Sequence, residues 1–325
     1  MADLRAASMD FVNGNVQLDD VRLQRLREFI APFRVPPGKK VRLERDYDPG
    51  FREGIRKKKQ GVELLEEGTR LLSDYQARLA AQDSWALLVV LQALDTAGKD
   101  GAIRHVMSGV NPQGVAVHSF KQPSAEELDH DFLWRYEQRL PARGQIGIFN
   151  RSHYEEVIVV RVHPELLARQ KLPKKARAAH VWERRFAEIN DWERYLADNG
   201  FMIVKLFLNL SKEEQRRRLL RRIDLPDHNW KFSEADIAER GRWDDYQRAI
   251  GEALSHTSTE WAPWHVIPAD RKWYARISIA LVIADALVRI DPRYPVVTKA
   301  QRRALLGVKA QLEAEAPAER DPQPA

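Results

Sequence analysis

The stretch Trp85-Ala-Leu-Leu-Val-Val-Leu-Gln-Ala-Leu-Asp-Thr-Ala-Gly-Lys99-Asp-Gly101 decides the fold class of this chain. An apolar run ends in a tight Gly-Lys turn and then enters a helical pattern, which is the layout of a phosphate-binding loop: strand, glycine turn, helix start. Backbone N–H groups at a helix N-terminus favour anionic oxygens, and a lysine at this position reaches the outer phosphates of a ligand. The stretch therefore predicts a substrate of the phosphoanhydride class.

The loop departs from the usual G-x-x-x-x-G-K-[ST] pattern at two positions. Ala93 stands where the first glycine is expected, and Asp100 replaces the Ser or Thr that would ligate Mg²⁺. The alternative interpretation is a buried strand followed by an ordinary turn. Asp95, inside the loop, favours phosphate binding, because a carboxylate among phosphates is repulsive unless a divalent cation lies between them.

Composition sets the outer limits. The chain has 325 residues, of which 44% are hydrophobic and 31% charged, so it reads as a soluble globular protein with one large α/β domain or two small ones. It has no cysteine, which excludes disulfides, cysteine-ligated zinc and cysteine nucleophiles. No apolar stretch is long enough to span a membrane, and the N-terminus lacks the apolar core of a secretory signal, so we expect a cytoplasmic protein.

The net charge of +6 suits an anionic partner, but charge alone does not choose between nucleic acid, an anionic membrane and a polyanionic small substrate. Along the chain we expect a basic N-terminal arm over 1–60 with a short helix near 20–32, a main domain over 61–305 that contains the phosphate-binding loop, and a flexible tail over 306–325.

Short apolar runs alternate with helical patterns after the arm. Strands are predicted at 86–93, 115–120, 145–149, 201–208 and 264–267, and helices at 61–81, 102–110, 176–198 and 275–290, with further helix starts at Ser124 and Ser233. Such alternation indicates an α/β fold with a central parallel sheet flanked by helices. Ligands of these sheets bind at the carboxyl ends of the strands.

The strand predicted at 145–149 leads into Asn150 and Arg151. Asn150 stands where a P-loop enzyme places a carboxylate linked to Mg²⁺, and it can ligate the ion without bringing charge. Arg151 can hold phosphate oxygens in bidentate fashion. Without the loop, the pair reads as a turn with a surface arginine. His153 is expected to be structural, since transfer to a phosphate acceptor needs no strong base.

A very basic helix opens at Ser211. Five arginines fall within seven residues, and Arg218 and Arg222 share one helix face. Arginines this close repel one another unless an anion bridges them, so we interpret about 211–245 as a helical basic lid that closes over phosphates. A solvated helix or an RNA-contacting face is the alternative.

Several motifs together resemble the family-2 polyphosphate kinases over roughly residues 35–295. They are Leu91–Gly101 with Val110-Asn-Pro-Gln-Gly114, Ser119–Glu127, Asp131-Phe-Leu-Trp-Arg135, Phe149-Asn-Arg-Ser-His-Tyr-Glu155, Ser211–Gln215, Trp230-Lys-Phe232, Thr257–Trp264 and Ile267–Tyr274. The resemblance implies a P-loop kinase fold that moves phosphoryl groups between inorganic polyphosphate and nucleotides with Mg²⁺, or with Mn²⁺ as the alternative ion.

The resemblance also assigns roles. It implies that Asp95 and Asn150 hold the metal, and that Lys99, Arg151, Arg218 and Arg222 act with them in catalysis. The residues implied to bind phosphate or nucleotide are Thr96, Ala97, Gly98, Asp100, Gly101, Arg104, Arg135, Ser152, Glu155 and Lys231.

The form Asn-Arg-Ser-His-Tyr-Glu, with Lys-Asp-Gly after the loop glycine, resembles the subgroup that accepts both AMP and ADP, which it converts to ADP and ATP. The resemblance further implies a homo-oligomer, dimer or tetramer, with no specific nucleic acid and no membrane among its partners. Three alternatives stay open: an ADP-only or GDP-preferring polyphosphate kinase, an ATP-dependent nucleotide kinase, and a non-catalytic nucleic-acid-binding protein.

Overall fold

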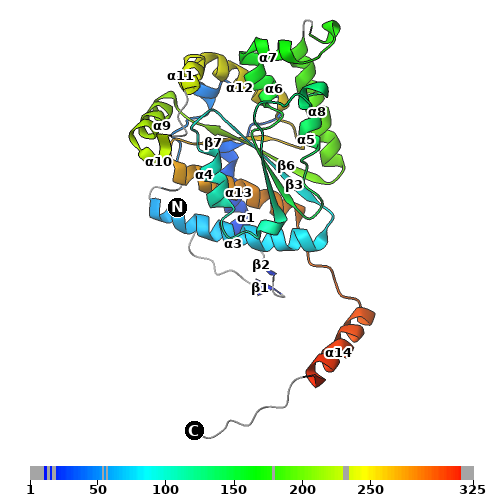
Figure 1. Cartoon of the computed structure of the whole chain (residues 1–325). Coiled ribbons are helices and arrows are strands. Elements are labelled where there is room, and N and C mark those ends of the chain that lie inside the picture. Colours follow the sequence, from blue (N-terminus) through cyan, green and yellow to red (C-terminus); the bar gives the residue numbers. More distant parts are fainter. Residues whose placement is uncertain are drawn as a thin grey trace.

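A five-stranded parallel sheet forms the centre of the molecule (Figure 1). The computed structural model describes residues 11–12, 15–16, 20–52, 55, 58–177, 180–229 and 234–315. The strands are β3 (Ala86–Ala93), β4 (Val115–Ser119), β5 (Ile146–Asn150), β6 (Phe201–Asn209) and β7 (Trp264–Pro268). Their order in the sheet is β4-β5-β3-β6-β7. The predicted α/β class and all five predicted strands are confirmed, with boundaries within two residues.

Helices cover both faces of the sheet. One face packs against α1 (Asp20–Ile30), α3 (Lys58–Gln82), α4 (Lys99–Val106) and α13 (Lys272–Ile290). The other face packs against α6 (Glu155–Val162), α8 (Val181–Asp198) and α12 (Trp243–Thr257). The chain leaves central β3 for β4 on one side and later returns to β6 on the other, so the topology switches direction at β3. In such sheets a crevice opens at the carboxyl end of the central strand.

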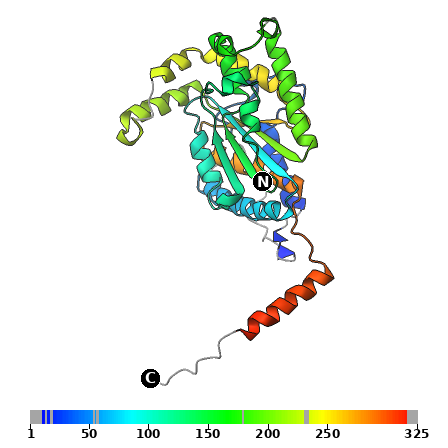
Figure 2. The same ribbon diagram turned by 45° about the vertical axis from the view of Figure 1, so that its right-hand side comes forward.

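The remaining helices are short or peripheral. They are α2 (Leu43–Asp46), α5 (Trp134–Glu137), α7 (Pro164–Arg169), α9 (Lys212–Asp224), α10 (Pro226–Asn229), α11 (Glu234–Gly241) and α14 (Lys299–Ala314). Two short strands, β1 (Phe11–Val12) and β2 (Asn15–Val16), pair antiparallel. Helices α9, α10 and α11 stand out at one side of the body in Figure 2, over the span predicted as a lid. Helix α14 spans the predicted boundary between main domain and tail, and it lies clear of the body.

The segment predicted as an arm belongs largely to the core where the structure describes it. Phe33, Val35 and Leu43 are buried, and Val35 N donates to the Trp264 carbonyl of edge strand β7 at 2.8 Å. An isolated bridge between Arg34 and His265 covers the same edge. The segment is basic and poorly periodic in sequence, but it shields a sheet edge that would otherwise expose unpaired backbone groups.

The helix predicted to start at Ser124 is a single turn. The capping box forms as expected, since Ser124 N donates to Glu127 Oε2 at 2.7 Å and Glu127 N donates to Ser124 Oγ at 3.2 Å. The backbone then becomes extended at His130, and Asp131 Oδ1 accepts from Leu133 N at 2.9 Å to start a new turn. A local cap fixes where a helix can begin but not how far it continues.

No helix within the described part of the chain combines the length and the apolar character that a membrane crossing requires. The most apolar helix, α13, is buried along most of its length between α3 and the sheet.

Two glycines of α3 test the contact between α3 and α13. A Cβ on Gly61 would lie 2.6 Å from the Trp273 ring, whereas a Cβ on Gly68 would meet only the Ala280 methyl at 3.6 Å. We expect Gly61→Ala to lower the free energy of unfolding by about 1–3 kcal/mol through overpacking. Gly68→Ala, the matched control, should raise it by about 0.5–1 kcal/mol because alanine favours the helix. Urea denaturation measures both, and equal stability of the two variants would contradict this packing.

Candidate active site

The loop that joins β3 to α4 has the backbone of a phosphate-binding turn. Gly98 adopts φ 100° at the N-cap of α4, and Thr96 adopts φ 66°, a left-handed conformation that is strained for a β-branched residue. The first intrahelical bond runs from Ala102 N to the Gly98 carbonyl at 2.9 Å. The backbone N–H groups that precede Ala102 therefore lie in the orientation that receives anionic oxygens.

Lys99 is the residue on which this loop centres. Its Nζ donates to the carbonyls of Ala93 at 2.9 Å and Leu94 at 3.5 Å, and only 9% of the residue is exposed. Burial, assisted by the positive charge of Arg151, lowers the pKa of Lys99 to about 8. The ammonium is thus held at the mouth of the loop, with its charge only partly offset by nearby carboxylates.

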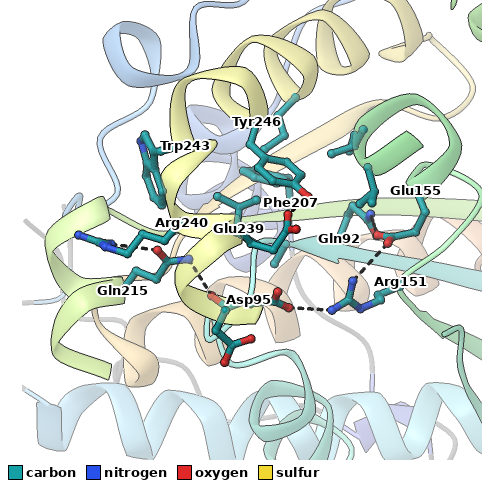
Figure 3. A pocket seen from close by; sticks show the side chains of 16 residues that line it. Gln92, Asp95, Arg151, Glu155, Phe207, Gln215, Glu239, Arg240, Trp243 and Tyr246 are labelled. Carbon is teal, nitrogen blue, oxygen red and sulfur yellow. Dashed lines mark hydrogen bonds and ion pairs between the residues drawn. The ribbon is translucent and has the colours of Figure 1, made fainter. Parts of the chain in front are cut away.

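Asp95 and Arg151 come from neighbouring strand ends and meet across the crevice. Arg151 Nη2 lies 2.7 Å from Asp95 Oδ1, and its Nη1 lies 3.2 Å from Glu155 Oε2 (Figure 3). Burial alone would lower the pKa of Arg151, but Glu155 and Asp95 outweigh it and raise the pKa. Arg151 adopts φ 65°, and its N–H donates to the Leu91 carbonyl of β3 at 3.1 Å. The guanidinium is therefore fixed beside the loop.

Asn150 faces the helical side of the loop. Its Nδ2 donates to Asp100 Oδ1 at 2.7 Å and to Ser119 Oγ at 3.3 Å. The first of these hydrogen bonds links the two unusual residues of the site. Asp100 replaces the Ser or Thr of the usual loop pattern, and Asn150 replaces the carboxylate usual at the strand end. An aspartate at position 150 would place two carboxylates in direct contact, whereas the amide donates a hydrogen bond to Asp100.

A fully buried ion-pair network supports the strand end that carries Arg151. Lys205 Nζ donates to Glu193 Oε2 at 2.6 Å, to Tyr154 OH at 2.9 Å and to the Thr257 carbonyl at 2.6 Å. His153 Nε2 lies 3.2 Å from Glu193 Oε1. Burial would raise the pKa of Glu193, but Lys205 and His153 lower it below its usual value. His153 is completely buried within this network, in agreement with the structural role expected for it.

The two arginines predicted for the lid have different surroundings. Arg218 is 7% exposed, and its five N–H groups are engaged by the carbonyls of Thr96, Ala97, Ala269 and Asp270 and by Glu214 Oε1. It holds the loop against the end of β7. Arg222 instead pairs with Asp236 of α11 at 3.1 Å. Lys231 lies outside the described residues.

Other predicted residues also differ in position. Ser152 is completely buried behind the strand end, and its Oγ accepts from Tyr154 N at 3.3 Å. Arg135 is buried, pairs with Glu127 at 3.2 Å and donates to the Lys121 carbonyl at 3.0 Å, in the segment that follows β4. Arg104 is exposed on α4. The structure therefore brings Asp95, Lys99 and Arg151 together, and places Arg135 in the short helix α5, in contact with the segment that follows β4.

A cluster of cations that the sequence analysis did not single out borders the loop. Arg276 Nη2 lies 4.0 Å from the Cβ position of Gly101. Burial and then the charges of Arg218, Arg221 and Arg276 lower the pKa of Lys272, while burial and Arg104 lower that of Arg276. Lys272 and Arg276 belong to α13, far beyond the loop in the sequence. Lys272 lies within the quoted segment Ile267–Tyr274, but Arg276 lies beyond it, and no sequence signal pointed to Arg276.

A cleft opens above the loop (Figure 3). Asp95, Arg151 and Glu155 line its polar end, and Gln215, Glu239 and Arg240 line the side toward α9 and α11. Its apolar lining comes from Trp243, Tyr246, Phe207, Ile158, Val159 and Ile250. None of these apolar residues was singled out from sequence, because α12 carries no motif that distinguishes a lining tryptophan from a core one.

The fold, with a glycine turn and Lys99 at the carboxyl end of parallel strand β3, is that of a P-loop phosphotransferase. The comparison with known families is consistent with that class: Polyphosphate kinase 2 (PPK2) matches residues 55–294. The chain therefore belongs to the polyphosphate kinase 2 family.

Individual relatives agree with this assignment. The chain is 49% identical over 284 residues to the ADP-polyphosphate phosphotransferase of Rhodopseudomonas palustris, covering 86% of this chain and 97% of the relative. It is 43% identical over 264 residues to the AMP/ADP-polyphosphate phosphotransferase of Meiothermus ruber, covering 81% and 94%. The crystal structure of polyphosphate kinase 2 from Arthrobacter aurescens TC1 superposes with a TM-score of 0.76 at 42% identity, covering 85% of this chain and 95% of that one.

The lowered pKa of Lys99 predicts a pH dependence of phosphate binding. In the folded protein the ammonium is charged below about pH 8, and a bound polyanion keeps it protonated. Affinity for inorganic tripolyphosphate, measured by calorimetry in EDTA, should therefore fall above pH 8 by up to about tenfold per pH unit. Lys99→Arg is the control, because its guanidinium stays charged and the titration of the ligand affects both proteins equally. Parallel pH profiles of the two proteins would contradict the binding of phosphate by the Lys99 ammonium.

Proposed function

We propose that this protein transfers phosphoryl groups from inorganic polyphosphate to AMP and ADP, giving ADP and ATP, with Mg²⁺ as the cofactor and Mn²⁺ as the alternative ion. The observation that carries the proposal is the position of the loop between two unlike surroundings. On one side lies a cleft with an aromatic lining, and bordering the helical end of the loop lie Arg104, Lys272 and Arg276, none of which lines that cleft.

The cleft suits the nucleotide. Trp243 and Tyr246 offer apolar surface to a base, while Arg151 and the loop offer positive charge to its phosphates. The cation cluster suits the donor, because a polyphosphate chain carries about one negative charge per phosphate and needs an extended set of cations. Burial and, after it, repulsion by neighbouring arginines lower the pKa values of Lys272 and Arg276, and a polyanion lying among these cations relieves the repulsion.

The residues of the loop also fit a divalent cation. Over the described residues no group of three or more His, Asp or Glu side chains is placed to hold a metal, so this part of the chain offers no closed cage. Mg²⁺ usually takes one or two protein ligands and completes its shell with phosphate oxygens and water. The carboxylate of Asp95, about one-third exposed beside the loop, and the side-chain amide oxygen of Asn150 would supply those ligands. The ion would neutralise charge on the bridging phosphate oxygens during transfer.

The side chains of the site position the reactants rather than exchange protons with them. The terminal phosphoryl group leaves the donor chain as its P–O bond breaks, and a new P–O bond forms to an oxygen of the acceptor phosphate, which is already an anion. The loop amides and Lys99 hold the phosphates of one substrate, and Arg151, fixed beside the loop, adds positive charge near the transferring group. Arg218 keeps the loop in shape through its five hydrogen bonds.

Use of both AMP and ADP is supported by the name of the Meiothermus relative and by the Asn150 form of the strand end, whereas the Rhodopseudomonas relative is named for ADP. Homo-oligomeric assembly, the absence of a specific nucleic-acid partner and a cytoplasmic location stay predictions from the sequence.

A comparison of donors tests the proposal. Purified protein with Mg²⁺ and polyphosphate should convert AMP to ADP and ADP to ATP, as followed by chromatography of the nucleotides. With ATP as the donor the acceptor must be AMP, because transfer from ATP to ADP regenerates the same two nucleotides, and little ADP should form. EDTA should stop the reaction. Lys99→Ala should lower the rate about 100-fold or more, since a charge on the transferring group is lost, while Lys309→Ala in exposed α14 leaves it unchanged. ADP formed from AMP with ATP as the only donor would favour an ATP-dependent nucleotide kinase. Product from GDP but not from ADP would favour a GDP-preferring polyphosphate kinase.

The pair formed by Asn150 and Asp100 tests the choice of acceptor. Asn150→Asp puts a carboxylate where an amide now donates to Asp100 at 2.7 Å, and we expect the ratio of AMP to ADP activity to fall about fivefold, which corresponds to about 1 kcal/mol. The double variant Asp100→Asn with Asn150→Asp restores the hydrogen bond and the net charge. It should recover thermal stability while the bias against AMP persists. An unaltered activity ratio in both variants would contradict the subgroup assignment.

A further inference from the structure

Helix α14 (Lys299–Ala314) has no use in the proposed reaction. Every residue from Lys299 to Glu315 is exposed, and the helix lies clear of the body in both views (Figures 1 and 2). It also follows the end of the family match at residue 294. A helix of 16 residues is marginal in water by itself, and most helical stability in proteins comes from packing an apolar face. The helix therefore needs a partner surface.

Three of the four large apolar side chains of α14 form one stripe, and the fourth, Leu306, is 58% exposed on another face. Leu305, Val308 and Leu312 are spaced three and four residues apart and share a face, and they are 59%, 52% and 62% exposed. Gln301 precedes them on the same stripe. This spacing is typical of the seam, the line of contact between two helices in a coiled coil. An apolar face this narrow is too small for a helix that is buried in a protein core. The capping box of Thr298 and Gln301 fixes the start of the helix and so the position of the stripe.

The charges of α14 are unevenly distributed along its axis. Lys299, Arg302 and Arg303 lie in the first half. The second half carries Lys309, whose Nζ lies 3.4 Å from Glu313 Oε1 in the last turn, and Glu315 directly follows the helix, so one lysine and two glutamates leave this end with a net negative charge. Two copies side by side in antiparallel orientation bring the basic half of each against the acidic end of the other. A parallel pair would set like charges together. The helix dipoles also favour the antiparallel arrangement.

We propose that α14 binds α14 of a second copy of this chain as an antiparallel pair related by a two-fold axis. In this pair Leu305 faces Val308 of the second copy, and Gln301 faces Leu312 of the second copy. Three apolar side chains on each helix bury less than the roughly 1,200 Å² typical of a stable interface. The pair is therefore a weak contact by itself and adds to any contact between the bodies. The inference does not depend on the proposed reaction.

Disulfide trapping tests the pair directly, because the chain has no cysteine and any single-cysteine variant can form a disulfide only with another molecule. Gln301→Cys mixed with a tagged Leu312→Cys should form a mixed disulfide about tenfold faster than either variant forms a disulfide with itself. Ala310→Cys is the matched control, since it lies on the opposite face of α14 and should show no preference. Fast pairing of Gln301→Cys with itself would show a parallel pair, and equal rates at seam and control positions would show none; either result overturns the proposal.

A second measurement separates the helix pair from other contacts. Leu305→Glu with Leu312→Glu should abolish the disulfide trapping and lower the weight-average molecular mass measured by sedimentation at high concentration. Ala310→Glu should change neither. The melting temperature of the body should stay unchanged, because α14 stands apart from it. A fall in that melting temperature would show that α14 packs on its own body, and would overturn the proposal.

Discussion

The parallel register of β3 with β5 and β6 is the constraint on which the site depends. Leu91 of β3 pairs with Asn150 of β5 and with Leu206 of β6, so the three strands reach the same edge of the sheet together. Neighbouring strands lie about 4.8 Å apart, and the residues that follow them are forced into contact. Asp95 and Arg151 meet at 2.7 Å for this reason, although 56 positions separate them. A slip of one residue would turn the strand side chains to the opposite face.

The site is built from cations that backbone carbonyls keep in place. Lys99 donates to the carbonyls of its own loop, and Arg218 spans the same loop and the segment after β7. Deeper still, Lys205 combines a carbonyl with the carboxylate of Glu193. Burying a charge is costly unless it is paired and hydrogen-bonded, and carbonyls supply hydrogen bonds without cancelling the charge. The positive field at the loop is thereby preserved for an anionic ligand.

Particular residues show how far sequence reasoning reached. The loop at 94–98 and the five strands could be predicted, because apolar runs and glycine turns are local signals. Arg218 and Arg222 looked equivalent, since a spacing of four places them on one helix face. The structure separates them: Arg218 clamps the loop, and Arg222 pairs with α11. Helical spacing states which residues share a face, but what that face meets depends on elements far away in sequence.

Sequence by itself determined the phosphate-binding loop, the alternation of strands and helices, and the motifs that mark the family, because each depends on neighbouring residues. The tertiary structure alone decided that residues 31–47 close the edge of the sheet, that α13 brings Lys272 and Arg276 to the loop, and that Trp243 and Tyr246 line the cleft. These placements depend on packing between segments that are distant in the chain. Packing follows from the summed burial and shape of many side chains, which no single motif encodes.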